Sequence, residues 1–166
     1  CKNYSHEMVY SLPIPPSPNL RSDISIRLYP SLCFFEGTTV SVGRGTNHPF
    51  ELYGHPDMDK DEFSFKPKST MGAVYPKHQN IECGGVNLID ESLASRFTLS
   101  YLIRALKLIG DPVSTINRKK FFILLSGTEM LYNQIISGLS ENEIRKTWHG
   151  DLEVYRGIRA KYLKYD

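Results

Sequence analysis

The sequence has neither a strong excess of charge of one sign nor a long apolar run. Its 166 residues include 20 basic and 18 acidic side chains, which give a net charge of +2 and form no basic stripe. We therefore predict no nucleic-acid partner, because binding to phosphates needs clustered lysine and arginine. The most apolar helical segment, residues 99–109, is interrupted by Arg104 and Lys107. A membrane span needs roughly 18 or more apolar residues, so we predict none.

Cysteine is scarce as well. Cys1, Cys33 and Cys83 are odd in number and follow no C-x-x-C spacing, so at least one thiol is free or pairs outside the chain. No charged region followed by an apolar one lies near Cys1, as a signal peptide would require. We therefore expect this chain to be a part of a longer protein. The alternative is a lipoprotein in which Cys1 is the acylated residue.

The usual metal and phosphate motifs are absent. None of the five histidines lies four residues from another, and the aspartates at 57, 59 and 61 lack the glycine and the glutamate that complete a calcium loop. No Gly-Lys-Ser/Thr follows the glycines at 43 and 45, which excludes a phosphate loop. Ser126 lacks the G-x-S-x-G surroundings of a nucleophile elbow, and its spacing to Glu129 is that of a helix cap. We predict no metal and no cofactor.

Proline is concentrated at one place. Residues 11–19, SLPIPPSPN, contain four prolines, which prevent a helix and favour an extended, polyproline-like segment. We interpret residues 1–22 as a linker or strap from a missing N-terminal domain. Residues 23–166 are then a single domain, since a chain of this length with 40% hydrophobic residues builds one core.

The apolar pattern changes its period along the chain. Apolar and polar residues alternate at 24–28, 40–42 and 63–65, which is typical of strands. Between 99 and 109 the apolar residues recur every three or four positions, which is typical of a helix, and Gly110 then ends it. Strands followed by helices predict an α+β fold, with a mixed or antiparallel sheet in the first half packed against C-terminal helices.

Two further helices are indicated by capping boxes. Ser126 with Glu129 predicts a short helix from about 128 to 137, and Ser140 with Glu143 predicts a longer helix that begins near 141. On the longer helix one side carries an apolar stripe, formed by Ile144, Trp148, Leu152 and Tyr155.

The densest group of polar and glycine residues is the segment 34–50, FFEGTTVSVGRGTNHPF. Its glycines allow a close approach of the backbone to a ligand, and Arg44 offers a planar fork suited to a carboxylate or a phosphate. A second interpretation is structural, namely a tight hairpin held by an ion pair between Glu36 and Arg44. Composition favours neither, because a single glycine-rich loop is a weak motif.

Several segments together resemble one known family. They are PPSPNL at 15–20, LYPSLCFFEGTTVSVGRGT at 28–46, PFELYGHP at 49–56, and the terminal patterns W-x-x-x-L and R-x-K-Y-L-x-Y. In these segments the chain resembles the bacterial exo-β-N-acetylmuramidases of peptidoglycan recycling. The resemblance implies a two-domain glycosidase that releases N-acetylmuramic acid from the non-reducing end of cell-wall fragments, outside the cytoplasm of a bacterium.

Within that family this chain resembles the second, α+β domain. The resemblance implies a Rossmann-like first domain that carries the catalytic glutamate in a Pro-Glu-His-Gly type of sequence, and no such sequence occurs here. This domain would then supply one wall of a cleft between the domains. The segment 117–122, which contains Arg-Lys-Lys, departs from the family pattern and suggests a different substrate preference. The alternative is a non-catalytic domain that binds cell-wall glycan or a protein.

The resemblance also implies which ligand the candidate site residues would bind. N-acetylmuramic acid carries a lactyl carboxylate, and a bidentate arginine would recognise it, which makes Arg44 the first candidate. Glu36 is a candidate second carboxylate for glycoside hydrolysis, or it holds Arg44 in place. Further candidates for hydrogen bonds to the sugar are Asn19, Thr38, Ser41, Thr46 and His48. These polar side chains are equally suited to hydrogen-bond the backbone of turns.

Overall fold

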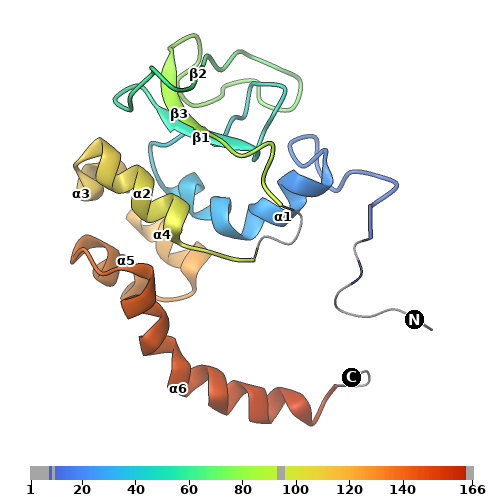
Figure 1. Ribbon diagram of the computed structural model, residues 1–166, viewed down its shortest axis with the longest axis vertical. Helices are drawn as coiled ribbons and strands as arrows, with labels where there is room; N and C mark the ends of the chain where they lie inside the picture. The colour runs from blue at the N-terminus through green and yellow to red at the C-terminus, as the bar shows by residue number, and fades with distance from the viewer. Residues whose placement is uncertain (1–7, 9, 93–95, 164–166) are drawn as a thin grey trace.

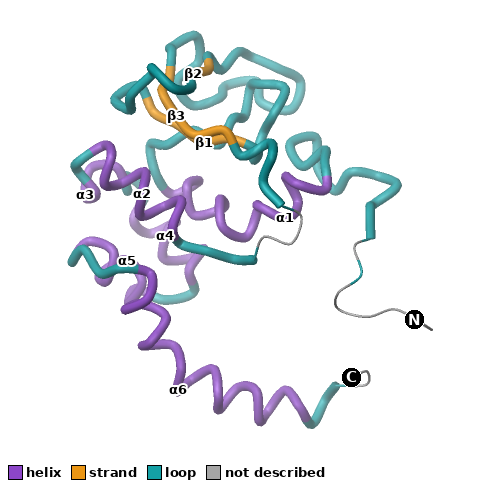
Figure 2. Tube along the Cα trace, in the orientation of Figure 1, coloured by secondary structure: helices purple, strands orange, loops and turns teal. Residues whose placement is uncertain are grey.

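In the computed structural model, which describes residues 8, 10–92 and 96–163, a small sheet lies against a group of helices (Figures 1 and 2). The sheet is antiparallel with strand order β1-β3-β2, and β1 pairs with β3 so that Tyr53 faces Val86 and Gly54 faces Gly85. The elements in chain order are α1 (Asp23–Leu32), the 3-10 helix η1 (Cys33–Gly37), β1 (Leu52–His55), β2 (Ser64–Phe65), β3 (Cys83–Asn87), α2 (Ser100–Ile109), α3 (Pro112–Thr115), α4 (Lys119–Ser126), α5 (Glu129–Ile136) and α6 (Glu141–Ala160).

The core joins the sheet to the helices. Phe35 of η1 stacks on Tyr53 of β1 with 5.0 Å between ring centroids, and both side chains are fully buried. Phe34 extends the aromatic contacts to Phe122 of α4, at 5.8 Å. The same cluster includes the buried leucines of α1 and α2, at 28, 32, 102 and 106. The short helix η1 therefore lies at the centre of the domain, between the sheet and the helices.

The predicted fold class is confirmed. The structure combines helices with an antiparallel sheet in the first half, and helices dominate the second half. The helix predicted at 99–109 is α2, and Gly110 ends it in a left-handed conformation with φ 86°. The capping box of Ser140 and Glu143 forms at the start of α6, as predicted.

The strand predicted at 24–28 is wrong, because this segment is part of α1. Ser22 caps the helix, since its side chain accepts a hydrogen bond from the backbone N–H of Ser25, and Ser25 returns the contact. Leu28 and Leu32, four residues apart, are both buried on one face of the helix. The alternation of isoleucine and polar residues is too short to outweigh this helical spacing and the cap.

The strand predicted at 40–42 is also wrong, whereas the one at 63–65 is confirmed as β2. Ser41 makes a single bridge to Gly54, with N–H···O distances of 2.9 Å in both directions. The chain then turns at Gly43, whose φ of 74° is left-handed. That turn prevents the pairing from extending into a ladder.

The capping role predicted for Ser126 is wrong. The N-cap of α5 is Thr128, whose side chain accepts a hydrogen bond from the N–H of Met130 at 3.1 Å. Ser126 ends the preceding helix α4 and donates to the carbonyl of Ile123. Gly127 is left-handed and separates the two helices, so the serine and Glu129 belong to different elements. Helix α4 was not predicted from the sequence.

The predicted stripe on α6 is buried over its first half. Ile144 is fully buried and Trp148 packs against the core, but Leu152 and Tyr155 are exposed. Figure 1 shows α6 leaving the other helices along its second half. None of the helices in the described ranges is both long enough and apolar enough to span a membrane.

The described part of the proline-rich segment is exposed as far as Pro16. A turn follows, in which the N–H of Leu20 donates to the carbonyl of Ser17 at 3.0 Å. Asn19 is buried in this turn and donates from Nδ2 to the carbonyl of Gly72 at 2.9 Å. The division into a strap at 1–22 and a domain at 23–166 stays a prediction, and residues 1–7 and 9 lie outside the described residues.

Candidate functional site

The candidate site is built around the segment that joins η1 to β1. Thr38 is fully buried and ends η1, because its Oγ1 donates to the carbonyl of Phe35 and accepts from the N–H of Val40. The chain then turns at Gly43. A Cβ at that position would lie 2.7 Å from the carbonyl oxygen of His48, so the turn requires glycine. Glu36 lies before this turn and Arg44 within it.

Glu36 and Arg44 form an ion pair. The distance from Nη2 of Arg44 to Oε2 of Glu36 is 3.3 Å, and the two side chains are 37% and 26% exposed respectively. The guanidinium also lies over the ring of Phe50, 5.2 Å from its centroid. The ion pair of the structural interpretation therefore exists, but the segment is not a hairpin, since it begins in a 3-10 helix. Arg44 keeps donors that the single carboxylate contact does not use.

A pocket of 390 Å³ opens beside this pair, a volume within the range typical of small-molecule sites. Its lining contains the cationic side chains of Arg44, Lys77 and Arg118 and the carboxylate of Glu36. The other lining residues are Ser41, Val42, Ala73, Val74, Tyr75 and Pro76. Because positive charge exceeds negative charge, the pocket is suited to a ligand that carries an anionic group.

Arg118 reaches the pocket because α4 packs tightly on η1. A Cβ at Gly37 would lie 2.9 Å from Cβ of Phe122, so the glycine allows the two helices to meet. The backbone N–H of Arg118 donates to the carbonyl of Gly37 at 3.2 Å. The guanidinium of Arg118 lies over the ring of Phe121, 4.5 Å from its centroid. The start of α4 thus places a second guanidinium, beside that of Arg44, in the lining of this pocket.

The loop that carries Tyr75 forms another part of the pocket wall. Thr70 and Ala73 pair in a turn, and the buried Asn19 holds this turn from the other side through Gly72. Tyr75 is 91% exposed. An exposed aromatic ring beside a polar pocket is suited to cover the apolar face of a bound molecule.

Lys77 holds the segment that carries Glu36. Its Nζ donates to the carbonyls of Phe35 at 2.8 Å, of Val40 at 3.1 Å and of Thr38. His78 continues the contact from Nε2 to the carbonyl of Thr39, at 2.7 Å. Burial lowers the pKa of Lys77 from 10.5 to about 8, although the nearby carboxylate of Glu36 opposes the shift. Three carbonyl acceptors explain why a lysine occupies this buried position.

The lowered pKa of Lys77 predicts a rise in stability with pH. Between about pH 8 and 10.5 the unfolded lysine binds a proton that the folded one has lost, so the free energy of unfolding increases through this window. The increase is at most about 1.4 kcal/mol per pH unit. We expect urea denaturation to show this slope in the wild type and to show none of it in Lys77→Met.

The slopes of the two proteins are compared between pH 8 and 9, where the contribution of two opposing groups is the same in both. Burial raises the pKa values of Cys33 and Cys83 from 9.0 to about 11, so these thiols lower stability increasingly as the pH approaches and passes 9, in the wild type and the variant alike. Lys77→Met is expected to be less stable at every pH because three carbonyls lose their donor. The test is therefore the difference in slope, and equal slopes in the two proteins would contradict the assignment.

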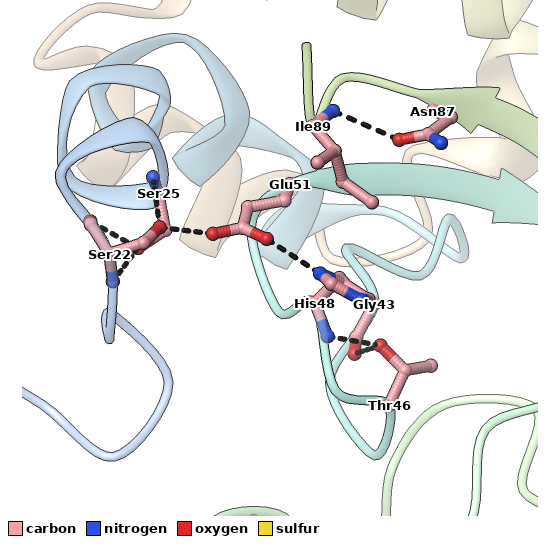
Figure 3. Close-up of polar contacts among 8 residues, drawn as sticks. All are labelled: Ser22, Ser25, Gly43, Thr46, His48, Glu51, Asn87 and Ile89. Atoms are coloured by element: carbon pink, nitrogen blue, oxygen red, sulfur yellow. Dashed lines mark hydrogen bonds and ion pairs between the residues drawn. The ribbon is translucent and has the colours of Figure 1, made fainter.

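A second cluster of polar contacts connects the N-terminus of α1 to the turn at Gly43 (Figure 3). Glu51 is buried and accepts hydrogen bonds from Ser22 Oγ and, at 2.8 Å, from His48 Nδ1. Thr46 donates to the carbonyl of Gly43 at 2.7 Å and accepts from the N–H of His48. This cluster ties the N-terminus of α1 to the turn and so fixes the loop that carries Arg44. A wider pocket of 630 Å³ has Thr46 and His48 among its lining residues.

The structure divides the candidate residues into three places. Glu36, Ser41 and Arg44 line the first pocket, whereas Thr46 and His48 line the second. Thr38 and Asn19 are buried, and the side chain of each donates a hydrogen bond to a backbone carbonyl. Their roles toward a ligand stay predictions. No spacing in the sequence connects Lys77, Arg118 or Tyr75 to Arg44, so these three residues could not be predicted from the sequence.

No cluster of three or more potential metal ligands is found among the described residues. His55 and His78 meet edge to face with 4.8 Å between centroids, and His55 lies 3.4 Å from a carboxylate oxygen of Asp57. Burial lowers the pKa of His55, with a smaller contribution from His78. His6 and Cys1 lie outside the described residues.

Comparison with known sequences gives one family and one curated relative. Residues 27–165 match the family model described as the C-terminal region of the exo-β-N-acetylmuramidase NamZ. The chain is also 30% identical, over 165 residues, to the peptidoglycan β-N-acetylmuramidase NamZ of Bacillus subtilis strain 168. That match covers 90% of this chain and 40% of the relative, so the chain spans less than half of the relative's length.

Two solved structures from Bacteroides fragilis have the same fold. One is a DUF1343 family protein with 43% identity and a TM-score of 0.90, in a match that covers 99% of this chain and 47% of that protein. The other, also a DUF1343 family protein, has 19% identity and a TM-score of 0.71 over 92% of this chain and 45% of its own. The second likeness concerns the fold alone.

Proposed function

Since this chain belongs to the family of C-terminal domains of the exo-β-N-acetylmuramidase NamZ, we propose that it is the C-terminal part of a peptidoglycan glycosidase. The full-length protein releases N-acetylmuramic acid from the non-reducing ends of cell-wall fragments. This domain contributes one wall of a cleft whose other wall is an N-terminal domain. We infer from this proposed substrate that the protein acts outside the cytoplasm of a bacterium.

The observation that carries this proposal is the cationic pocket beside the Glu36–Arg44 pair. N-acetylmuramic acid differs from N-acetylglucosamine by a lactyl ether that bears a carboxylate. A guanidinium binds a carboxylate through two parallel N–H···O bonds, which fix its orientation as well as its charge. Arg44 takes this role, and Glu36 holds the guanidinium in place before the ligand arrives. Arg118 adds positive charge to the pocket lining, and the exposed ring of Tyr75 covers a sugar face.

The number of carboxylates in the pocket indicates which domain supplies the catalytic acid and which binds the sugar. Glycoside hydrolysis commonly uses two carboxyl groups, one as an acid and one as a base or nucleophile. Among the described residues Glu36 is the one carboxylate that lines the 390 Å³ pocket, and it is engaged with Arg44. The N-terminal domain therefore supplies the catalytic acid. This domain binds and orients the sugar, and Glu36 serves as a second carboxylate only where Arg44 releases it.

Hydrolysis by the full-length protein tests the proposed function. We expect it to release the chromophore from a chromogenic N-acetylmuramide, and N-acetylmuramic acid from natural muropeptides. The matched N-acetylglucosaminide, which lacks the lactyl carboxylate, should react at least about tenfold more slowly, because the charged contact to Arg44 is lost. If no sugar is released from either muramic substrate, the glycosidase assignment fails and a glycan-binding or protein-binding domain becomes the better account.

A further inference from the structure

The second half of α6 has an apolar face that no other described part of the chain covers. Ile144 and Trp148 lie on the core, and Leu152, Tyr155 and Ile158 follow on the same side at helical spacing. These three side chains are 44%, 59% and 51% exposed. The apolar stripe thus continues along the helix. The other helices lie beside its first half and do not extend along its second half (Figure 1).

The sequence of this half-helix does not explain its stability by itself. Residues 150–160 span about 16 Å, and isolated helices of this length are marginal in water. Gly150 and Gly157 lower the helix propensity further, and a Cβ at either would meet nothing within 4 Å. The exposed pair of Arg156 and Glu153 adds little. A helix with these properties needs a surface to pack against.

A second exposed apolar segment lies near the other end of the chain. Tyr10, Leu12 and Ile14, in and before the proline-rich strap, are 63%, 44% and 79% exposed. In Figure 1 the described part of this segment and the end of α6 both lie on the right of the view. Both are exposed apolar surfaces, and a single partner on that side would cover the two of them.

The comparisons point to one candidate for that partner. The matched region is a C-terminal domain, and more than half of each compared protein lies outside the match, since this chain covers 40% to 47% of them. We propose that the exposed α6 face, formed by Leu152, Tyr155 and Ile158, is the docking surface for the N-terminal domain of the same protein. This inference rests on the proposed function only in that it treats the chain as the C-terminal part of a longer protein.

The charges beside the face disfavour a membrane as the occupant. Helices that lie on membranes carry lysine and arginine on their polar side and few acidic residues. Here Asp151 and Glu153 lie about one to three turns before Arg156, Arg159 and Lys161, so acidic and basic residues are mixed along the polar side. A protein surface with mixed charge at its rim is the better match.

Thiol accessibility in the full-length protein tests the docking surface. Two single variants are compared, I158C on the apolar face and R156C on the polar face two residues earlier. Their reaction rates with a maleimide are measured by mass spectrometry of the α6 peptide. We expect the I158C thiol to react at least about tenfold more slowly, because it becomes accessible only when the domains separate locally. Wild-type amides at 152–160 should show matching protection from hydrogen exchange.

The outcomes separate the possible occupants. Slow labelling of I158C that is independent of protein concentration supports docking of the N-terminal domain within one chain. Equal rates for the two variants, with fast amide exchange in the wild type, overturn the proposal. Protection that appears only at high protein concentration indicates a second copy, and protection that appears only with anionic phospholipid vesicles indicates a membrane; either overturns it. No step involves hydrolysis, so failure of the glycosidase assignment leaves this test unaffected.

Discussion

Replacement of Arg44 by alanine in the full-length protein is expected to lower kcat/KM for a chromogenic N-acetylmuramide by about 10- to 100-fold. Hydrogen bonds to charged groups contribute roughly 1.5–3 kcal/mol, and 1.4 kcal/mol corresponds to a factor of ten. The guanidinium lines the pocket and pairs with Glu36 at 3.3 Å. Its removal takes away the partner of the lactyl carboxylate and leaves Glu36 to repel it. Steady-state kinetics on the purified variant measure the effect.

Two further variants separate recognition from folding. Arg44→Lys keeps the charge but not the planar fork, so it should recover only a part of the lost kcat/KM. Arg27→Ala removes an exposed arginine of α1 that does not line the pocket, and it should leave kcat/KM unchanged. Wild-type kinetics in a folded Arg44→Ala variant would exclude Arg44 from substrate recognition.

Replacement of Phe35 by alanine is expected to cost about 3–5 kcal/mol of stability, the usual range for a fully buried phenylalanine. The side chain is 0% exposed and stacks on Tyr53, so the cavity would open between η1 and the sheet. Glu36 follows directly in η1, and its position depends on the same packing. The free energy of unfolding from urea denaturation measures this loss.

Leu124→Ala is the control for this large effect. Leu124 lies on α4 and is 77% exposed, and surface substitutions of this kind usually change stability by less than about 0.5 kcal/mol. If Phe35→Ala were as stable as Leu124→Ala, η1 would not be the centre of the core. Activity adds a second test, since Phe35→Ala should lose activity under conditions in which Leu124→Ala keeps it.

The sequence predicted the helices of the second half better than the elements of the first. In α2 a period of three or four and the terminal Gly110 indicate the same helix, and in α6 the same period agrees with the capping box of Ser140. In the segment 24–28 the alternation of apolar residues contradicted the cap at Ser22, and the cap with its helical burial decided the outcome. Short patterns are ambiguous because five residues fit both periods.

The candidate site was predictable only where its residues are close in sequence. Glu36, Ser41 and Arg44 lie within nine positions, and the structure places them in one pocket. Lys77 and Arg118 reach this pocket from a distant loop and from the start of α4, through packing that depends on Gly37 and on three backbone carbonyls. Such contacts have no sequence spacing, so tertiary structure was required to find them.

The central claim is that the pocket beside Glu36 binds the carboxylate of N-acetylmuramic acid through Arg44. A crystal structure of the full-length protein with bound N-acetylmuramic acid tests this claim most directly. We expect two guanidinium nitrogens of Arg44 within about 2.7–2.9 Å of the lactyl carboxylate oxygens, the usual length of charge-assisted hydrogen bonds. The sugar ring should face the N-terminal domain. A sugar bound elsewhere, with Arg44 still paired to Glu36 and the 390 Å³ pocket free of sugar, would contradict the account.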